Sequence, residues 1–356
     1  MNTMRSLRLI SSVLICFSIA SFAQQSSSPE SSTKDAGAIL SKASSLVDLR
    51  APGAVPFLML ANVALHEGRK SVDGVFAMAY SGSGQFRTVL RFPNFNSTEI
   101  LNDGTIYRKR SSEGLPLAIW RLQNLMSISA AYRATSEWKI GGVQTEQIGD
   151  VALDCVSALS MSSPFPANFS RISIWARGGP PEAKICVNAA TGEPFSIERS
   201  SSAYHLESVH ERYEFSDYQP FEGKSFPRKL LFHAGNGESI EVQVQKLIRS
   251  SAFPADEFVG MAGSTQGKYC ELPQTTGELM PSSGNAIPFG SGHFEANIYF
   301  RVNAAGGVEY AQVVQSSDPL RDKQFVKWFV GTHFPIRSCG GIAIQYETVV
   351  TLISGR

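Results

Sequence analysis

Long runs in which apolar and polar residues alternate constrain the fold of this 356-residue chain more than any other feature. One run extends from residue 72 to 111, and turn signals interrupt it at residues 81–84, 93–94 and 102–104. Alternation places successive side chains on opposite faces of a strand, and the Asn-Asp-Gly sequence of the last turn is a strong hairpin signal. The run therefore predicts three or four antiparallel strands.

Similar alternation continues as far as residue 250, with hairpin signals at residues 190–192 and 235–237. Two segments have helical spacing instead, residues 36–49 and residues 115–126. We therefore predict an α+β fold that is mostly antiparallel β, with one large sheet domain over residues 35–252 and a few helices packed against it.

The N-terminus has the pattern of a secretory signal peptide. Arg5 and Arg8 precede an apolar stretch of 14 residues, Leu9 to Phe22, and a small residue stands at Ala23. The stretch is short for a membrane span, so we expect cleavage after Ala23 in a periplasmic or secreted protein. Whether the segment is instead retained as an anchor stays open. The Ser-rich residues 24–34 are expected to be a disordered leader.

Cleavage would leave four of the five cysteines, namely Cys155, Cys186, Cys270 and Cys339. An even number of cysteines in an exported chain predicts two disulfides, for which three pairings exist. We favour Cys155 with Cys186 and Cys270 with Cys339, because each pair stays within one region of the chain. The alternative is four buried thiols. A metal site is not expected, because no two of these cysteines have two-residue spacing.

Periodicity fades after residue 252, and residues 253–293 are rich in Pro, Gly and Ser, the composition of a linker. Residues 294–356 are expected to form a second, small αβ domain. It would contain a strand, a turn at Gly306-Gly307, a second strand, a helix from Asp318 to Val330 and a closing strand over residues 342–352.

The sequence carries no catalytic, metal or cofactor motif. The formal net charge is +1 without a basic cluster, which argues against nucleic acid as a partner. We find no HExxH, G-x-S-x-G, P-loop or GxGxxG motif, and the six histidines are isolated. We therefore expect a binding protein rather than an enzyme, without a cofactor. A hydrolase would instead require a Ser or carboxylate cluster beside His205 or His210.

Large aromatic and aliphatic side chains crowd the first sheet region. They are explained either by an ordinary core under a curved sheet or by an apolar cavity that holds a ligand. Under the second hypothesis, the candidate cavity residues are Phe76, Met78, Phe92, Leu117, Trp120 and Leu125.

Residues 35–250 resemble the LolA and LolB lipoprotein carriers, in which helices close a half-barrel. The resemblance rests on a helix, a strand with Gly74, the phrase QFRTVLRFPNFNSTEILNDGTIYRKR at residues 85–110, and a pair of closing strands in which Gly223 and Pro227 match. It implies a hydrophobic cavity for acyl chains and no catalytic residues.

Residues 294–356 resemble the C-terminal domain of TonB-type energy transducers. Strand residues 297–303, the turn at Gly307-Val308, the Ser-Ser pair at 316–317, and Phe325, Trp328 and Phe334-Pro335 carry the resemblance. It implies a small module with an exposed sheet edge, which can accept a strand from a partner protein. The transducers' uncleaved membrane helix and long Pro-rich spacer are not expected here.

Together these features predict an exported bacterial envelope protein. Its half-barrel would bind an apolar ligand (a lipid, an acyl chain or a lipoprotein), and its C-terminal module would contact an envelope protein by strand addition. The first alternative is an interaction scaffold whose half-barrel is filled by its own side chains. The second is an accessory protein of a TonB-dependent system that binds no ligand.

Overall fold

The computed structural model describes residues 34–133, 138–160, 182–200, 210–235, 237–250, 252–270, 274–276 and 294–354. The expected signal peptide (residues 1–23), most of the expected leader (residues 24–34) and the alternating segment at residues 170–177 lie outside these ranges. The described chain from Lys34 onward belongs to one compact unit. No helix in the described ranges has the length and apolar character to span a membrane.

The first part of the chain has eight elements: α1 (Ala36–Val47), β1 (Phe57–Glu67), β2 (Lys70–Tyr80), β3 (Phe86–Phe92), β4 (Phe95–Asn102), β5 (Thr105–Arg110), α2 (Leu117–Met126) and α3 (Ile128–Ala131). Strands then follow one another: β6 (Trp138–Ile148), β7 (Val151–Ser160), β8 (Glu182–Asn188), β9 (Pro194–Ser200), β10 (Glu211–Phe221), β11 (Lys224–Ala234), β12 (Glu238–Arg249), β13 (Thr265–Lys268) and β14 (Gln274–Thr276).

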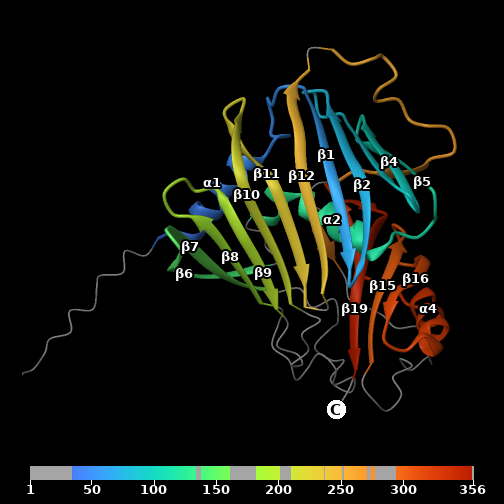
Figure 1. The fold of residues 1–356 in the computed structure, drawn as a ribbon. Helices are drawn as coiled ribbons and strands as arrows, with labels where there is room; N and C mark the ends of the chain where they lie inside the picture. The colour runs from blue at the N-terminus through green and yellow to red at the C-terminus, as the bar shows by residue number, and fades with distance from the viewer. Residues whose placement is uncertain are drawn as a thin grey trace, which may run out of the picture. The chain divides into compact units, whose positions relative to one another are not determined.

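All these strands except β14 belong to one 13-stranded sheet, with the order β13-β5-β4-β3-β2-β1-β12-β11-β10-β9-β8-β7-β6. Every pairing in it is antiparallel (Figure 1). Most neighbours are joined by a hairpin, such as the β4–β5 turn, where both Asp103 and Gly104 have positive φ. Two pairs are exceptions, because β1 pairs with β12 and β5 pairs with β13, and both partners lie far along the chain. The prediction of a large antiparallel sheet is confirmed.

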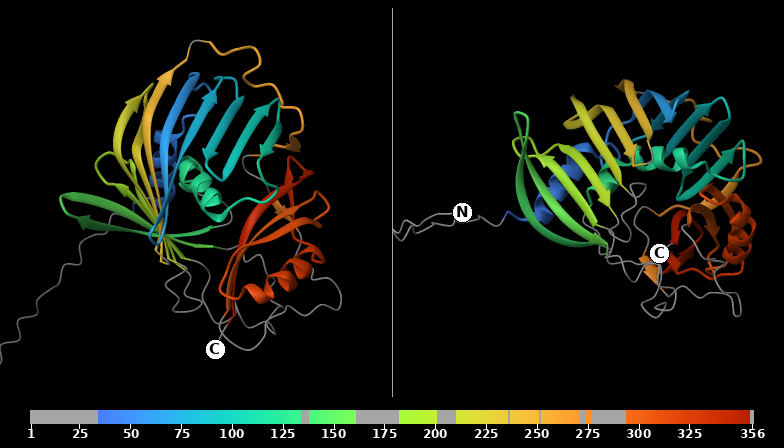
Figure 2. Two further views of the ribbon diagram at one scale, coloured as in Figure 1. Left: turned by 45° about the vertical axis from the view of Figure 1, so that its right-hand side comes forward. Right: turned by 60° about the horizontal axis from the view of Figure 1, so that its bottom comes forward.

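Helices α1 and α2 lie against one face of the sheet, which curves around them (Figure 2). Helix α1 begins at Asp35, whose side chain accepts hydrogen bonds from the N–H groups of Gly37 (2.9 Å) and Ala38 (3.2 Å). Its buried residues are Leu40, Ala43, Ser44 and Val47, which follow the i, i+3, i+4, i+7 spacing of one helix face. This face of the sheet and the helices share one hydrophobic core.

The C-terminal module consists of β15 (Phe294–Val302), β16 (Val308–Ser316), the 3₁₀ turn η3 (Pro319–Arg321), α4 (Asp322–Val330), β17 (Ile336–Cys339), β18 (Ile342–Ile344) and β19 (Tyr346–Ser354). Strands β16, β15 and β19 form one sheet in that order, and β14, β17 and β18 form another. The predicted Gly306-Gly307 turn is present, and Gly306 has a φ of 87°. A Cβ at Gly306 would lie 2.6 Å from the carbonyl oxygen of Phe334, so a larger residue does not fit.

Helix α4 supplies the core of the C-terminal module. Phe325, Trp328 and Phe329 are all buried and pack against Phe300 and Phe334. These aromatic side chains therefore stabilise the module, as buried aromatic clusters do, and are not available to a ligand.

Residues 252–270, which include the start of the linker predicted over residues 253–293, pack against the large sheet. Phe253 and Phe258 pack with Ala79 and Ile100 on the outer face of the sheet, which is the face turned away from α1 and α2. The segment then adds β13 to the edge strand β5. This packing could not be predicted from the sequence, because short irregular segments rich in Pro and Gly have no periodicity.

Candidate functional site

A cavity of about 270 Å³ lies on the concave face of the sheet, among β1 to β5, the α1–β1 connection and the α2–α3 junction. Strand register explains its walls. Met59, Met78, Thr88, Glu99 and Arg108 are paired in turn across β1 to β5 and so form one row on the same face. Along this row the side chains change from apolar to polar and then to charged. The cavity consequently has one apolar wall and one charged wall.

The apolar wall comes mainly from β1 and β2. It contains Phe57, Met59, Phe76 and Met78, and all of them except the half-buried Met78 are buried. Their neighbours in β1, Leu58 and Leu60, point the other way and are each 40% exposed. Two methionines in this wall provide flexible, polarisable side chains that adapt to an irregular apolar partner.

The charged wall comes from β4 and β5. Glu99 forms ion pairs with two arginines through the same oxygen. Arg108 Nε lies 3.4 Å and Arg110 Nη2 lies 3.0 Å from Glu99 Oε1. Arg110 also donates to the Tyr299 hydroxyl (3.2 Å) and to Glu347 Oε2 (2.9 Å), both in the C-terminal module. The charged wall is therefore tied to the C-terminal module.

Electrostatics around Arg110 follow from its burial. Burial by itself would raise the pKa of the Glu347 carboxyl, but the attraction of Arg110 and Arg108 outweighs burial and lowers this pKa. Burial, reinforced by Glu347, raises the pKa of Tyr299 to about 12. At neutral pH the cluster therefore contains a carboxylate, a guanidinium and a neutral phenol.

The junction between α2 and α3 closes the cavity on the helix side. Met126 and Ile128 add apolar surface, and Gln123, Ser127 and Ser129 add polar groups. The helix breaks at Ser127, whose hydroxyl donates to the carbonyl oxygen of Gln123 (2.9 Å). Such a back-bonded serine competes with the helical hydrogen bonds, which explains the break here.

Arg50, Phe86 and Tyr269 line another part of the cavity. The guanidinium of Arg50 lies over the Phe86 ring, 5.0 Å from its centroid, and Tyr269 meets the same ring edge-on at 5.8 Å. Tyr269 precedes Cys270, which forms a disulfide with Cys339 of the C-terminal module. One wall of the cavity is therefore covalently linked to that module.

The structure brings two of the six sequence candidates, Phe76 and Met78, into the cavity lining. Leu125 is fully buried in the core, Leu117 is nearly so, and Trp120 packs against the core while half-buried. The ring of Phe92 covers Gly74, where a Cβ would lie only 2.3 Å from the ring.

Sequence analysis missed several lining residues. Phe57 and Met59 belong to the alternating segment FLMLANVALHE at residues 57–67, so their signal was present. Arg50 and Tyr269 lie in connections, where side-chain direction follows no period. Glu99 and Arg108 alternate correctly with their neighbours, but only strand register shows that they meet.

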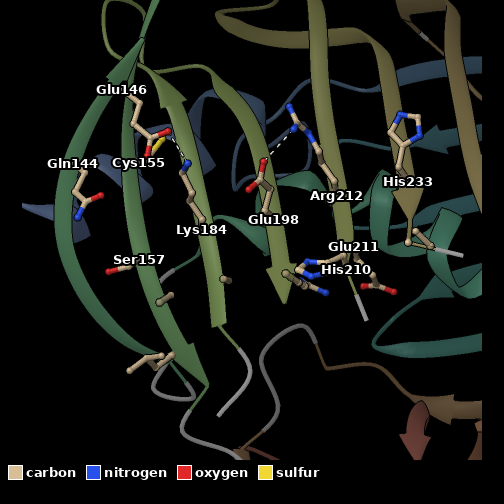
Figure 3. A pocket seen from close by; sticks show the side chains of 16 residues that line it. Gln144, Glu146, Cys155, Ser157, Lys184, Glu198, His210, Glu211, Arg212 and His233 are labelled. Carbon is tan, nitrogen blue, oxygen red and sulfur yellow. Dashed lines mark hydrogen bonds and ion pairs between the residues drawn. The ribbon is translucent and has the colours of Figure 1, made fainter. Parts of the chain in front are cut away.

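A second, larger hollow of about 740 Å³ lies along β6 to β11, and both polar and apolar residues line it (Figure 3). Lys184, Glu198 and Arg212 line it and alternate with the core residues Ile185, Ile197 and Tyr213, so they project from the outer face. Several of its charged residues form ion pairs: Lys184 with Glu146 (2.6 Å), Arg212 with Glu198 (3.2 Å), and Arg212 with Glu214 (2.6 Å). These are solvated pairs of the kind common on sheet surfaces.

The second hollow contains a histidine and a serine, two residue types named in the hydrolase alternative. No side-chain hydrogen bond or ion pair joins His210 or Ser157 to another residue in the described ranges. Within the same ranges no group of three or more His, Cys, Asp and Glu side chains is placed to hold a metal ion. His205, the other histidine of the hydrolase alternative, lies outside the described residues.

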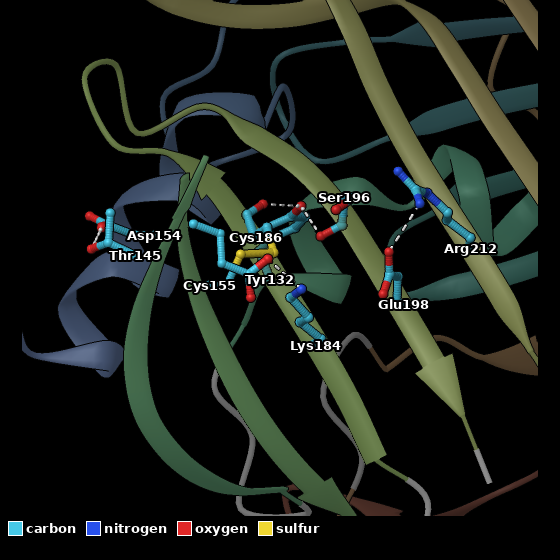
Figure 4. The surroundings of a disulfide bond; sticks show 10 residues. Tyr132, Thr145, Asp154, Cys155, Lys184, Cys186, Ser196, Glu198 and Arg212 are labelled. Atoms are coloured by element: carbon cyan, nitrogen blue, oxygen red, sulfur yellow. Dashed lines mark hydrogen bonds and ion pairs between the residues drawn. A yellow bond between two sulfur atoms is a disulfide. The ribbon is translucent and has the colours of Figure 1, made fainter. Parts of the chain in front are cut away.

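Both disulfides have the pairing favoured from the sequence. Cys155 and Cys186 face each other across β7 and β8, and their bond is buried beside the second hollow (Figure 4). Beneath it, the buried hydroxyl of Tyr132 lies 3.1 Å from the carbonyl oxygen of Cys186 and 3.2 Å from that of Ser196. Burial raises the pKa of Tyr132 well above its usual range, so the phenol stays protonated and can donate to these oxygens.

Comparison with known proteins shows that part of this chain is similar in fold to several solved structures. No protein-family model and no curated protein matches the sequence. Among solved structures, the chain is similar to the LolA superfamily protein NE2245 from Nitrosomonas europaea, with 12% identity and a TM-score of 0.41 over 63% of this chain and 97% of that one. It is also similar to a DUF1329 family protein from Desulfovibrio piger, with 10% identity and a TM-score of 0.42 over the same shares.

A third similar structure is the MucA/MucB complex of Pseudomonas aeruginosa, with 9% identity and a TM-score of 0.29 over 89% of this chain and 94% of that one. At these identities and scores no functional residue is carried over to this chain. The resemblance of the C-terminal module to TonB-type transducers gains no support from these comparisons. The candidate site therefore stands on its own geometry.

Proposed function

We propose that this protein binds one acyl chain, or the end of a longer one, in the cavity on the concave face of the sheet. The observation that carries this proposal is the apolar wall of Phe57, Met59, Phe76 and Met78, which borders open volume instead of being filled by neighbouring side chains. Apolar cavities of this kind take up hydrophobic ligands.

The size of the cavity limits its ligand. At roughly 30 Å³ for a water-sized group, a volume of about 270 Å³ holds about nine such groups. Burying nine methylenes would contribute about 7 kcal/mol at roughly 0.8 kcal/mol each, before the costs of ordering the ligand. The cavity therefore suits a single chain, and a ligand with several chains would leave the others outside.

The proposed location is the bacterial envelope, in the periplasm or outside the cell. Two disulfides support an oxidising compartment, because reducing conditions in the cytosol disfavour them. The signal-peptide pattern of residues 1–23 predicts the same location.

Binding can be tested with a neutral apolar fluorophore, N-phenyl-1-naphthylamine, and its displacement by decanol. Met59 and Leu60 are consecutive in β1 and face opposite sides, so Met59→Trp fills the cavity while Leu60→Trp changes only the outer face. We expect Met59→Trp to abolish displaceable binding and Leu60→Trp to preserve it.

Met78→Trp provides a second filling variant, in case Met59→Trp unfolds. Circular dichroism melting would establish that each variant is folded. Equal binding by the wild type and by both folded filling variants would exclude the cavity as the ligand site and leave the scaffold alternative.

The C-terminal sheet supports a second candidate function, contact with a partner protein. Strands β16 and β19 each pair only with β15 among the described strands, so each has an outer edge that no other described strand occupies, the kind of edge used in strand addition. Hydrogen exchange in a complex purified from the native envelope would test this candidate. Added protection confined to β16 or β19 is expected, and unchanged exchange in both strands would contradict it.

A further inference from the structure

Arg50 stands apart from the other charged side chains of the cavity. It is half-buried, lines the cavity and lies over the Phe86 ring at 5.0 Å. Its backbone is held from both sides, because its N–H donates to Asp48 Oδ1 (3.1 Å) and its carbonyl oxygen accepts from the Tyr80 hydroxyl (3.4 Å). The fixed backbone and the stacking on Phe86 together place this guanidinium at the cavity.

The positive charge of Arg50 is not balanced by any carboxylate in the described ranges. Asp48, two residues away, pairs with Arg133 through a bond of 3.1 Å. Glu99, the carboxylate that lines the cavity, is held by Arg108 and Arg110. The cavity lining thus contains two guanidinium groups and one carboxylate, and the carboxylate is already paired.

Apolar surface lies directly beside Arg50. Phe86 is paired with Tyr80, and Tyr80 with Phe57, so one row of aromatic side chains leads from the guanidinium to the apolar wall. A chain that packs on Phe57 and Met59 can therefore place its polar end at Arg50. The fork of a guanidinium matches the oxygens of a carboxylate or a phosphate.

We infer that the ligand is an anionic amphiphile, in which one alkyl chain occupies the apolar wall and a carboxylate or phosphate binds Arg50. This inference rests on the proposed function and specifies its ligand class. The free acid and the phosphate ester share the recognised chemistry, and the experiment separates them.

The test compares decanol, decanoate and decyl phosphate as ligands that share one chain length and differ at the head. Each is titrated against the wild type, Arg50→Gln and Arg50→Lys, with displacement of the neutral fluorophore as the readout. Arg249→Gln is the matched control, because Arg249 is 64% exposed and does not line the cavity.

In the wild type we expect at least one of the two anions to bind about tenfold more tightly than decanol, in line with a hydrogen bond to a charged group. Arg50→Gln should remove this preference, so that the two anions bind this variant no more tightly than decanol does. Arg50→Lys should keep part of the preference for the anion, and Arg249→Gln should keep all of this preference. The anion that is preferred identifies the headgroup as a carboxylate or a phosphate.

The outcomes separate this inference from the proposed function. Equal binding of decanol and both anions to the wild type would overturn the inference and leave the acyl-chain site intact. A preference that persists unchanged in folded Arg50→Gln would also overturn it. Absence of binding by all three ligands would refute the proposed function itself, and the inference with it.

Discussion

Arg110 of β5 donates a hydrogen bond of 2.9 Å to Glu347 of β19 and so joins the large sheet to the C-terminal module. The two side chains are only 8% and 13% exposed. Glu99 and the hydroxyl of Tyr299 complete the cluster around the guanidinium. A buried charge that bridges two parts of a chain makes their association sensitive to the loss of either partner.

Glu347→Gln should therefore lower the free energy of unfolding at neutral pH by about 2 kcal/mol. Breaking a buried pair costs about 3–5 kcal/mol when one charge is left alone, and here Glu99 continues to compensate Arg110. Urea unfolding followed by circular dichroism measures the difference. Glu241→Gln is the control, since Glu241 is 45% exposed in its pair with Lys229 and should change stability by less than about 1 kcal/mol. Indistinguishable variants would show that the cluster does not stabilise the fold.

Stability should depend on pH through the same residue. Attraction by Arg110 lowers the folded-state pKa of Glu347 below its ordinary value of 4.5. A carboxyl with a lowered folded-state pKa stabilises the protein above its unfolded-state pKa and loses this contribution as the pH falls through its folded-state pKa. The stability difference between wild type and Glu347→Gln should hold from pH 7 to pH 5 and shrink below 4.5. Urea unfolding at a series of pH values tests this, and a difference that grows in acid would contradict it.

Arg121 of α2 is a buried cation whose loss should destabilise the protein. Its side chain is 6% exposed, bridges Glu211 and Glu238, and lies over the Phe232 ring at 5.1 Å. Arg121→Met leaves both carboxylates without this partner, so we expect a loss of about 3 kcal/mol.

The matched control for Arg121→Met is Arg212→Met. Arg212 also forms two ion pairs but is 42% exposed, so its loss should cost less than about 1 kcal/mol. Adding Glu211→Gln and Glu238→Gln to Arg121→Met should recover part of the lost stability, because these substitutions remove the two carboxylates that Arg121→Met leaves without their partner. Equal thermal stability of the two arginine variants would refute the prediction.

The two disulfides should differ in what their removal does to ligand binding. Their cysteines are 31 and 69 residues apart in the sequence, and replacing either pair by serines should cost about 2–4 kcal/mol. Only Cys270–Cys339 adjoins a cavity residue, Tyr269. Fluorophore binding should therefore weaken in the folded Cys270→Ser/Cys339→Ser variant and persist in Cys155→Ser/Cys186→Ser. The reverse pattern would contradict the proposed site.

Local features of the fold could be predicted from the sequence because they depend on nearby residues. The helix that begins after Asp35, the hairpin at Asp103-Gly104 and the turn at Gly306-Gly307 each follow from spacing or from turn chemistry. The disulfide pairing followed from the regions in which the cysteines lie.

Other features depend on residues that are distant in the sequence. The strand at residues 57–67 has clear alternation, but its partner β12 cannot be read from that pattern, because many strands present the same period. The charged wall of the cavity likewise depends on how strands pair. Glu99 and Arg108 look like ordinary polar residues of a half-buried strand until the register places them beside Met78 and Thr88.

The pairing of β1 with β12 also determines when the sheet can form. Phe57 cannot pair until Arg249 has been synthesised. At about 5–20 residues per second, synthesis alone therefore separates the appearance of the two partners by roughly 10–40 s. Contacts so far apart in sequence also form slowly once both strands exist. Under the proposed envelope location, this delay would keep the centre of the sheet unformed while the chain crosses the membrane.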